Sequence, residues 1–238
     1  FLISSAIALI ALTLTLTTLP ETLKTKAAKA TQWWDIGLSN LITGLAIPKI
    51  GILLIINFLI GTTFTIFTFG FQPYFIHILH QNSEALTLLF AALGVVSVVV
   101  QGKGIGLLTK RTSLVNILFL GLFMRSVTFV LMPIFPNMIF FVCVCLTFSA
   151  FNSLVQPTIT TIISLNSKPE EQGTTMGLNA SYLNFSNAFG PIIAGMIVHQ
   201  SNPQTYSYPL YLAGGLTFAV LLFAISKQRQ FTLGQQTT

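Results

Sequence analysis

The sequence predicts an all-α polytopic membrane protein with seven transmembrane helices. Of its 238 residues, 53% are hydrophobic and only 7% are charged, whereas about a quarter of the residues in a soluble globular chain carry charge. Apolar runs near the length needed to cross a bilayer, about 20 residues, recur along the whole chain. The net charge of +6 lies in short clusters between these runs, which favours membrane topology over binding to nucleic acid.

The apolar runs place the spans. Residues 1–20 carry no charge and form the first span, and the proline at position 73 ends the second. Residues 21–49 form a linker, in which Trp33 and Trp34 suit the headgroup level of a bilayer. The seven predicted spans are residues 1–20, 50–72, 85–101, 113–133, 137–164, 173–198 and 210–226, and residues 227–238 form a polar tail.

Basic residues alternate from one connector to the next. The connectors that carry Lys or Arg are 21–49, 102–112, 165–172 and the tail at 227–238. The connectors between them are 73–84, the turn that follows residue 133, and 199–209, and they carry neither. Lys and Arg concentrate in cytoplasmic connectors of membrane proteins. The pattern therefore predicts that Phe1 lies outside and that the linker and the C-terminus lie in the cytoplasm.

Three stretches resemble the C-terminal half of a major facilitator superfamily transporter. "LPETL" (residues 19–23) resembles the end of the family's sixth helix, and "GKGIGLLTKRTS" (residues 102–113) resembles its basic loop between helices eight and nine. "PEEQGTTMGLNASYLNFSNAFGPIIAG" (residues 169–195) resembles the loop before the eleventh helix and that helix itself. Thr109 stands where the basic loop usually carries an acid. The chain is most similar to the drug and tetracycline efflux antiporters.

The resemblance implies a domain organisation and a set of partners. Residues 1–20 are then the last helix of the N-terminal bundle, 21–49 the central cytoplasmic linker and 50–226 the C-terminal six-helix bundle. The N-terminal bundle of the same protein is then the missing partner, since many transporters pair two such bundles. The other expected partners are the lipid bilayer of the plasma (inner) membrane, a small-molecule substrate and the proton as coupling ion.

Polar residues at helical spacing predict the substrate cavity. Residues spaced three or four apart share one helix face, and amides inside a membrane span face a partner or water because exposure to lipid is costly. The second span carries Asn57, Gly61, Thr65, Thr68 and Gln72 at this spacing. The fifth carries Ser149, Asn152, Gln156 and Thr160. The resemblance makes these spans the family's seventh and tenth helices, which line its central pathway.

We therefore expect substrate to meet amide side chains of these two spans. The principal candidates are Asn57, Gln72, Asn152 and Gln156, with Thr65 and Thr68 beside them. Weaker candidates on the sixth span are Asn179, Tyr182 and Ser186. The alternative is that these side chains form hydrogen bonds between helices of the bundle.

Small residues and a proline mark the sixth span as a packing or gating helix. Gly173, Gly177 and Ser181 form one small-residue stripe, and a second stripe consists of Ser186, Gly190 and Ala194. Such stripes let neighbouring backbones approach closely in lipid, and Pro191 removes one helical hydrogen bond and can kink the span. We expect a helix that suits rocking of one bundle against another, with static packing as the alternative.

Arg125 is the one charge deep inside a predicted span. An intramembrane charge is a functional candidate by default. The expected partners of Arg125 are carbonyls or hydroxyls such as Ser126 or Thr128, or a group on the missing bundle, and a structural role is the alternative. No acid lies inside the six later spans, and Glu84 lies at the outer end of the third. Any carboxylate that couples transport to protons is therefore expected in the missing bundle.

Other polar chemistry is sparse. Cys143 and Cys145 point to different faces of a helix, and this spacing argues against both a disulfide and a metal site. His77 and His80 lie near the outer end of the second span, where they could sense pH or bind metal, or serve as polar interfacial residues. We expect no catalytic residues, no metal site and no cofactor.

The predicted function is secondary active transport, as a fragment that exports amphipathic or drug-like molecules by proton exchange. Amide and hydroxyl stripes with 21 Phe residues suit a neutral or weakly polar organic molecule. Two alternatives stay open. One is an uptake symporter for a sugar or other metabolite, and the other is a non-transporting membrane scaffold or assembly factor on the same fold.

Overall fold

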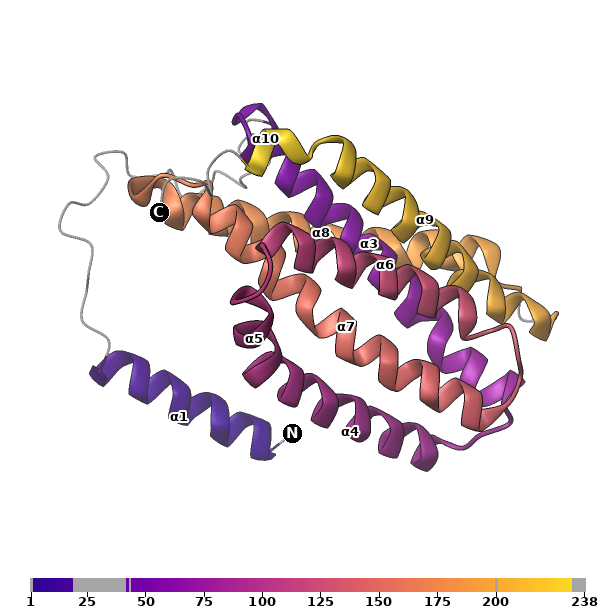
Figure 1. The fold of residues 1–238 in the computed structure, drawn as a ribbon. Helices are drawn as coiled ribbons and strands as arrows, with labels where there is room; N and C mark the ends of the chain where they lie inside the picture. The colour runs from indigo at the N-terminus through magenta and orange to yellow at the C-terminus, as the bar shows by residue number, and fades with distance from the viewer. Residues whose placement is uncertain (1, 19–41, 43, 200, 233–238) are drawn as a thin grey trace. The chain divides into compact units, whose positions relative to one another are not determined.

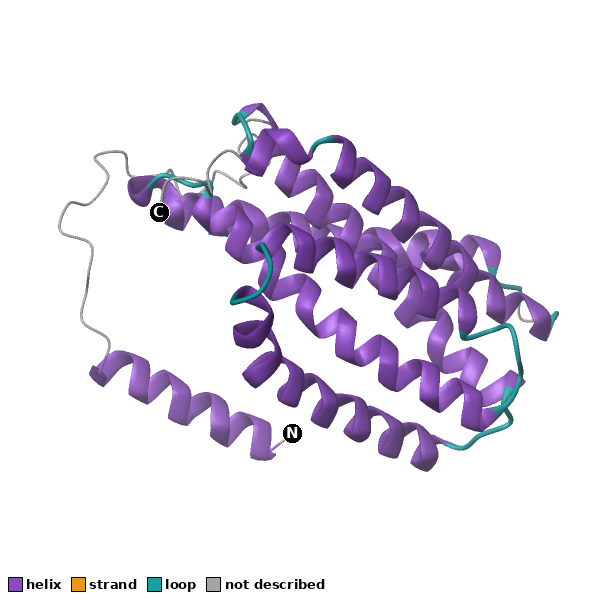
Figure 2. Ribbon diagram, viewed as in Figure 1, coloured by secondary structure: helices purple, strands orange, loops and turns teal. Residues whose placement is uncertain are grey.

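The computed structural model describes residues 2–18, 42, 44–199 and 201–232, which form two compact units, Phe1–Ile36 and Gly37–Thr238. Nearly all of the described residues are helical and none lies in a strand (Figure 2). The all-α prediction is therefore confirmed for this part of the chain. Most of the predicted linker, including Trp33 and Trp34, lies outside the described residues.

The first unit contributes helix α1 (Leu2–Thr18) (Figure 1). Its 17 residues are almost all apolar or Thr, and at about 1.5 Å per residue they extend about 26 Å. The hydroxyls of Thr13, Thr15 and Thr17 each donate to the carbonyl four residues earlier over 2.8 Å. These threonines therefore find hydrogen-bond partners within their own helix, as polar side chains in lipid need.

The second unit is a bundle of long helices. Its elements, in chain order, are α3 (Ile50–Pro73), η1 (Tyr74–Ile78), α4 (Ser83–Val99), η2 (Val100–Gly104), α5 (Ile105–Thr109), α6 (Leu114–Leu131), α7 (Met138–Leu165), η3 (Pro169–Glu171), α8 (Gln172–Ile197), η4 (Pro203–Ser207), α9 (Tyr208–Ser226) and α10 (Gln228–Thr232). Asparagine and serine caps begin three of the long helices. Asn82 accepts the amide N–H of Ala85 at the start of α4, and Asn137 does the same for Phe140 at the start of α7.

Five stretches are long and apolar enough to cross a membrane: Ile50–Ile78, Ser83–Thr109, Leu114–Leu131, Met138–Leu165 and Pro203–Ser226. Helix α1 is shorter, and α8 is not among the five although it has 26 residues. The Asn, Ser, Thr and Gly content of α8 lowers its hydropathy. The predicted count of seven spans is therefore not confirmed, although a helix lies at each predicted position.

One boundary prediction is wrong at Pro73. The helix does not end there but continues to Ile78 as the π-helical segment η1. Proline lacks an amide hydrogen and its ring crowds the carbonyl four residues earlier. The amide N–H of Tyr74 nevertheless bonds to the carbonyls of Gly70 and Phe71. The wider π-turn keeps the following amides paired, so the proline alters the helix without breaking it.

A second boundary prediction is wrong in the glycine-rich stretch after residue 101. The expected connector at 102–112 is helical through η2 and α5 to Thr109, so Lys103 lies on a helix. The apolar pattern resumes in α5, and this favours helix over loop. The continuous element has 27 residues and extends about 40 Å, longer than a hydrocarbon core of about 30 Å.

Each long helix of the bundle packs against one or more of the others. Helix α3 packs along α8 and α9, α6 packs along α7 and α9, and α4 lies against α7 (Figure 1). Small residues allow close approach at these contacts. A Cβ on Gly121 of α6 would lie 2.9 Å from Val155 of α7. Close packing of this kind stabilises helix pairs in lipid, where little hydrophobic driving force remains between helices.

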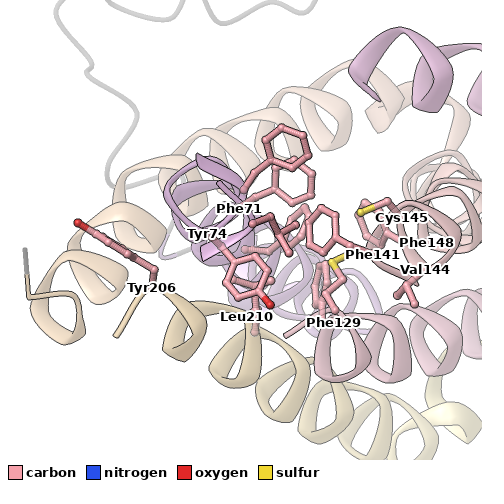
Figure 3. Close-up of a cluster of buried hydrophobic side chains, with 14 of the residues drawn as sticks. Phe71, Tyr74, Phe129, Phe141, Val144, Cys145, Phe148, Tyr206 and Leu210 are labelled. Carbon is pink, nitrogen blue, oxygen red and sulfur yellow. The ribbon is translucent and has the colours of Figure 1, made fainter. Parts of the chain in front are cut away.

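Two hydrophobic clusters form the core. The first is rich in aromatic residues, with Phe71, Phe129, Phe141 and Phe148 among its members (Figure 3). The second contains mainly Ile, Leu and Val, including Leu53, Leu118 and Ile159. Cys145 is buried in the first cluster while Cys143 is exposed, and both thiols are free. The prediction that the two cysteines lie on different faces is therefore confirmed.

Candidate substrate cavity

A polar layer separates the two hydrophobic clusters. On α3 the second cluster ends at Ile60 and the first begins at Ile66, and on α6 the corresponding residues are Leu122 and Phe129. Polar residues occupy these intervals and their equivalents on α7 and α9. They are Thr62, Thr63, Thr65, Arg125, Ser126, Thr128, Ser149, Asn152, Ser153 and Thr217. Buried polar groups therefore gather at one level of the bundle.

A cavity of about 350 Å³ opens at this level. Its polar lining comes from α4 to α8 and consists of Ser97, Gln101, Arg125, Asn152, Ser153, Gln156 and Asn187. Its apolar lining includes Ile60, Phe64 and Leu183. Gln101 and Asn187 are exposed and mark its open side. Pockets that bind small organic molecules have this volume and this mixture of apolar walls with a few polar groups.

A second cavity of about 270 Å³ adjoins the first and shares three lining residues with it, Phe64, Ser97 and Asn152. Its character is different. Five phenylalanines line it, namely Phe64, Phe67, Phe71, Phe90 and Phe148. Together the two cavities offer a polar end and an aromatic end, which suits an amphipathic molecule.

Arg125 lies in the wall of the first cavity. Its side chain is buried, and its Nη2 donates to the carbonyl oxygen of Ile60 over 2.8 Å and to the Thr63 hydroxyl over 2.9 Å. Its guanidinium carbon lies 5.4 Å from the Phe64 ring centroid and 5.2 Å from that of Phe129. These distances permit cation–π attraction. The partners come from α3 and α6.

The predicted kind of partner for Arg125 is thus correct, but the named residues are wrong. Ser126 donates its hydroxyl to the Gly214 carbonyl on α9 over 2.8 Å. Thr128 donates to carbonyls of its own helix, those of Met124 and Arg125. Ser126 therefore reaches α9 and Thr128 bonds back to its own helix, whereas the Arg125 side chain reaches α3. Sequence neighbours therefore gave no guide to the contact.

The amino-acid sequence matches the model of a known protein family. The Major Facilitator Superfamily model matches residues 1–189 and again residues 53–233. The chain belongs to the major facilitator superfamily. It is an integral membrane protein of a transporter family, and the apolar helices agree with this assignment. Among curated proteins, no match reaches significance.

In this superfamily member, the predicted stripe on α7 meets the cavities. Asn152 lines both cavities, Gln156 lines the first and Ser149 lines the second. Ser149 also donates its hydroxyl to the Leu93 carbonyl on α4 over 2.7 Å. The spacing of this stripe therefore places three polar side chains along one wall.

Two members of the predicted stripe on α3, Asn57 and Thr65, contact α8 instead of a cavity. Asn57 is fully buried and donates from Nδ2 to Oδ1 of Asn179 on α8 over 2.6 Å. Thr65 donates to the Ser186 carbonyl on α8 over 3.1 Å. Asn57, Asn179 and Thr65 therefore form hydrogen bonds between helices, which was the alternative to a substrate role. None of these three residues lines either cavity.

Of the remaining candidates of this major facilitator protein, one lines a cavity and two do not. Thr68 lines the second cavity, while its hydroxyl donates to the Phe64 carbonyl over 2.9 Å. Gln72 is exposed near the end of α3 and is not part of either cavity lining. Tyr182 is half-buried and packs against the second hydrophobic cluster.

The two small-residue stripes of α8 differ in their surroundings. A Cβ on Gly190 would lie 2.6 Å from Thr65 Cβ, so this glycine lets α8 approach α3 closely. Pro191 follows it inside the helix. At Gly173 and Gly177, no described atom lies within 4 Å of such a Cβ. Within the described bundle, α8 therefore packs closely against α3 at the second stripe, and no such contact is found at Gly173 or Gly177 of the first.

Sequence reasoning missed several lining residues of this superfamily member, including Ser97, Gln101 and Asn187. Ser97 and Gln101 are four apart on one helix, so a periodic signal was present. It was hidden because Gln101 was assigned to the end of a span.

His77, a pH or metal candidate, stacks on Tyr206 with ring centroids 5.0 Å apart. Within the described ranges, no group of three His, Cys, Asp or Glu could hold a metal ion.

Proposed function

We propose that this protein is a secondary active transporter that exports small amphipathic organic molecules across the plasma membrane in exchange for protons. The observation that carries the proposal is the pair of adjoining cavities at the polar layer. One cavity presents amides and Arg125, and the other presents five phenylalanines. A site that is polar at one end and aromatic at the other recognises a molecule built in the same way.

A second helix bundle completes the pathway in this proposal. Gly173 and Gly177 have no described neighbour beside them, and Leu88, Val95 and Val98 of α4 are between 66% and 73% exposed. Both α4 and α8 border the open side of the first cavity. A second bundle against these two helices would cover the apolar surface and close the cavity, as in two-bundle transporters.

The coupling carboxylate would come from that second bundle. The described acidic residues are Glu84 in the first turn of α4, and Glu170 and Glu171 in η3. None of them lines either cavity. The proposed orientation places the C-terminus in the cytoplasm, as the alternation of basic connectors predicts.

The test uses everted membrane vesicles that contain the full-length protein. A proton gradient is imposed, a panel of amphipathic anions, neutral molecules and cations is added, and lumenal pH is followed. Proton exchange predicts alkalinisation with at least one compound, and its loss in Gln156→Ala would tie transport to the cavity. Gln72→Ala is the matched control, since Gln72 is an exposed amide outside both cavities. No response to any compound, with protein present in the vesicles, would contradict the proposal.

A further inference from the structure

Arg125 carries a positive charge that the described part of the protein does not neutralise. The side chain is only 2% exposed, and its Nε is buried without a hydrogen-bond partner among the described residues. Both hydrogen bonds of its guanidinium start from Nη2 and end on neutral oxygens, the Ile60 carbonyl and the Thr63 hydroxyl. A guanidinium has five N–H donors in a planar fork that fits a carboxylate.

Among the described residues, no acid lines either cavity. The ion pair found among the described residues joins Lys168 and Glu171 at the exposed start of the η3 segment, far along the chain from Arg125. The rings of Phe64 and Phe129 attract the cation but contribute no negative charge. Buried charges in proteins are paired with a charge of opposite sign or held by hydrogen bonds. The first cavity is therefore positive at its wall.

We propose that the first cavity binds the anionic group of an amphipathic monoanion, such as a carboxylate, directly at Arg125. This inference rests on the proposed transport function and names the class of substrate. Asn152 and Gln156 offer amide N–H groups on the neighbouring wall. The aromatic body of the same molecule lies in the second cavity, among Phe67, Phe71 and Phe148.

The chemistry of the two cavities selects a single charge. One guanidinium can balance one carboxylate, and a second anionic group would enter an aromatic lining without a partner. A cationic amphipath of the same shape would meet Arg125 as a like charge in a site of low dielectric, which disfavours binding. A neutral molecule would fit the space but leave the guanidinium donors unpaired.

The test compares three fluorescent probes of matched shape: dansylglycine, its methyl ester and a dansyl derivative that ends in a trimethylammonium group. Full-length protein in lipid nanodiscs is titrated with each probe, and empty nanodiscs give the contribution of lipid. We expect the carboxylate to bind at least about tenfold more tightly than the ester, because hydrogen bonds to a charged group are strong. The ammonium probe should bind more weakly than the ester.

Three variants locate the effect. Arg125→Gln should lose at least about tenfold in carboxylate affinity while it keeps the affinity for the ester. Arg125→Lys keeps the charge and should retain part of the preference for the carboxylate. Arg111→Gln is the matched control, since it removes one exposed positive charge at the end of α5 without touching either cavity. Its affinities should equal those of the unmodified protein.

The outcomes separate this inference from the proposed function. Equal binding of the three probes to the unmodified protein, or preference for the ammonium, would overturn the anion site and leave the transport proposal standing. Equal losses of carboxylate and ester in both Arg125 variants would assign Arg125 to packing and overturn it as well. Absence of saturable binding by any probe would overturn both the anion site and the cavity on which the transport proposal rests. If Arg125→Gln does not fold, the ranking of the three probes on the unmodified protein still decides whether the cavity prefers an anion.

Discussion

Asn57 of α3 and Asn179 of α8 are joined by a hydrogen bond of 2.6 Å between their side chains, deep in the bundle. The pair lies 122 residues apart in sequence. The bond connects two helices that approach each other closely through small residues, at Gly61 beside Ser186 and at Gly190 beside Thr65. Asn57, a principal substrate candidate on α3, therefore holds the bundle together instead.

Removal of either asparagine of this pair should destabilise the bundle. Asn57→Ala leaves the Asn179 amide buried and unpaired, at a cost of about 1 kcal/mol, with up to about 1.7 kcal/mol seen between membrane helices. The double variant should lose less than the sum of the single losses. Unfolding in mixed micelles measures both effects. A double variant whose loss equals the sum would show that the two side chains do not interact.

The two glycine stripes of α8 should respond in opposite ways to alanine. Gly190→Ala places a methyl group 2.6 Å from Thr65 Cβ, and overpacking of this kind costs about 1–3 kcal/mol. Gly177→Ala adds a methyl group where no described atom lies within 4 Å, and alanine favours helix over glycine by about 1 kcal/mol. Thermal unfolding of the two variants in detergent tests this contrast. Equal destabilisation by both would contradict the packing that the structure shows.

Glu84 should be dispensable for proton coupling. It lies in the first turn of α4 and outside both cavities, so Glu84→Gln should leave substrate-driven proton movement within about twofold of the unmodified protein, a barrier change of less than about 0.5 kcal/mol. Lumenal pH in everted vesicles gives the measurement. Abolished coupling in Glu84→Gln, with the protein present at normal level, would place the coupling carboxylate in this chain.

Lining residues that the sequence analysis missed should also affect transport. Gln101→Ala and Asn187→Ala remove amides from the open side of the first cavity. Loss of one hydrogen bond to a neutral group, about 0.5–1.5 kcal/mol, predicts a roughly two- to tenfold rise in the substrate concentration for half-maximal transport. Protein stability should not change, because both side chains are exposed. Unchanged transport in both variants would move the substrate path away from this opening.

The sequence predicted the long helices because apolar runs and polar spacing are local properties. It failed at Pro73 and in the first part of the expected connector, at 102–109, because rules for helix breakers describe straight α-helices. This chain instead widens into π-turns that keep amides paired. The α7 stripe was informative because one helix face lines both cavities. The α3 stripe was not, because its outcome depended on which helix lies beside it.

Long-range contacts were beyond local patterns for the same reason. Arg125 bonds to groups 62 and 65 positions earlier in the chain, and no spacing rule connects those positions. Its burial agrees with its place inside an apolar span. The identity of its partners followed only from the tertiary arrangement, in which the Arg125 side chain extends from α6 to α3.

The most direct test of the substrate cavity is protection of a cysteine placed within it. In a Cys143→Ser, Cys145→Ser background, Asn152→Cys puts a thiol where the two cavities meet. Ser226→Cys puts a control thiol at the exposed end of α9, outside both cavities. Each is labelled with a small maleimide in the presence and absence of the compound that drives the largest proton movement in vesicles. The cavity account predicts that this compound slows labelling of Asn152→Cys severalfold and leaves Ser226→Cys unchanged. Equal labelling rates at Asn152→Cys with and without the compound would contradict it.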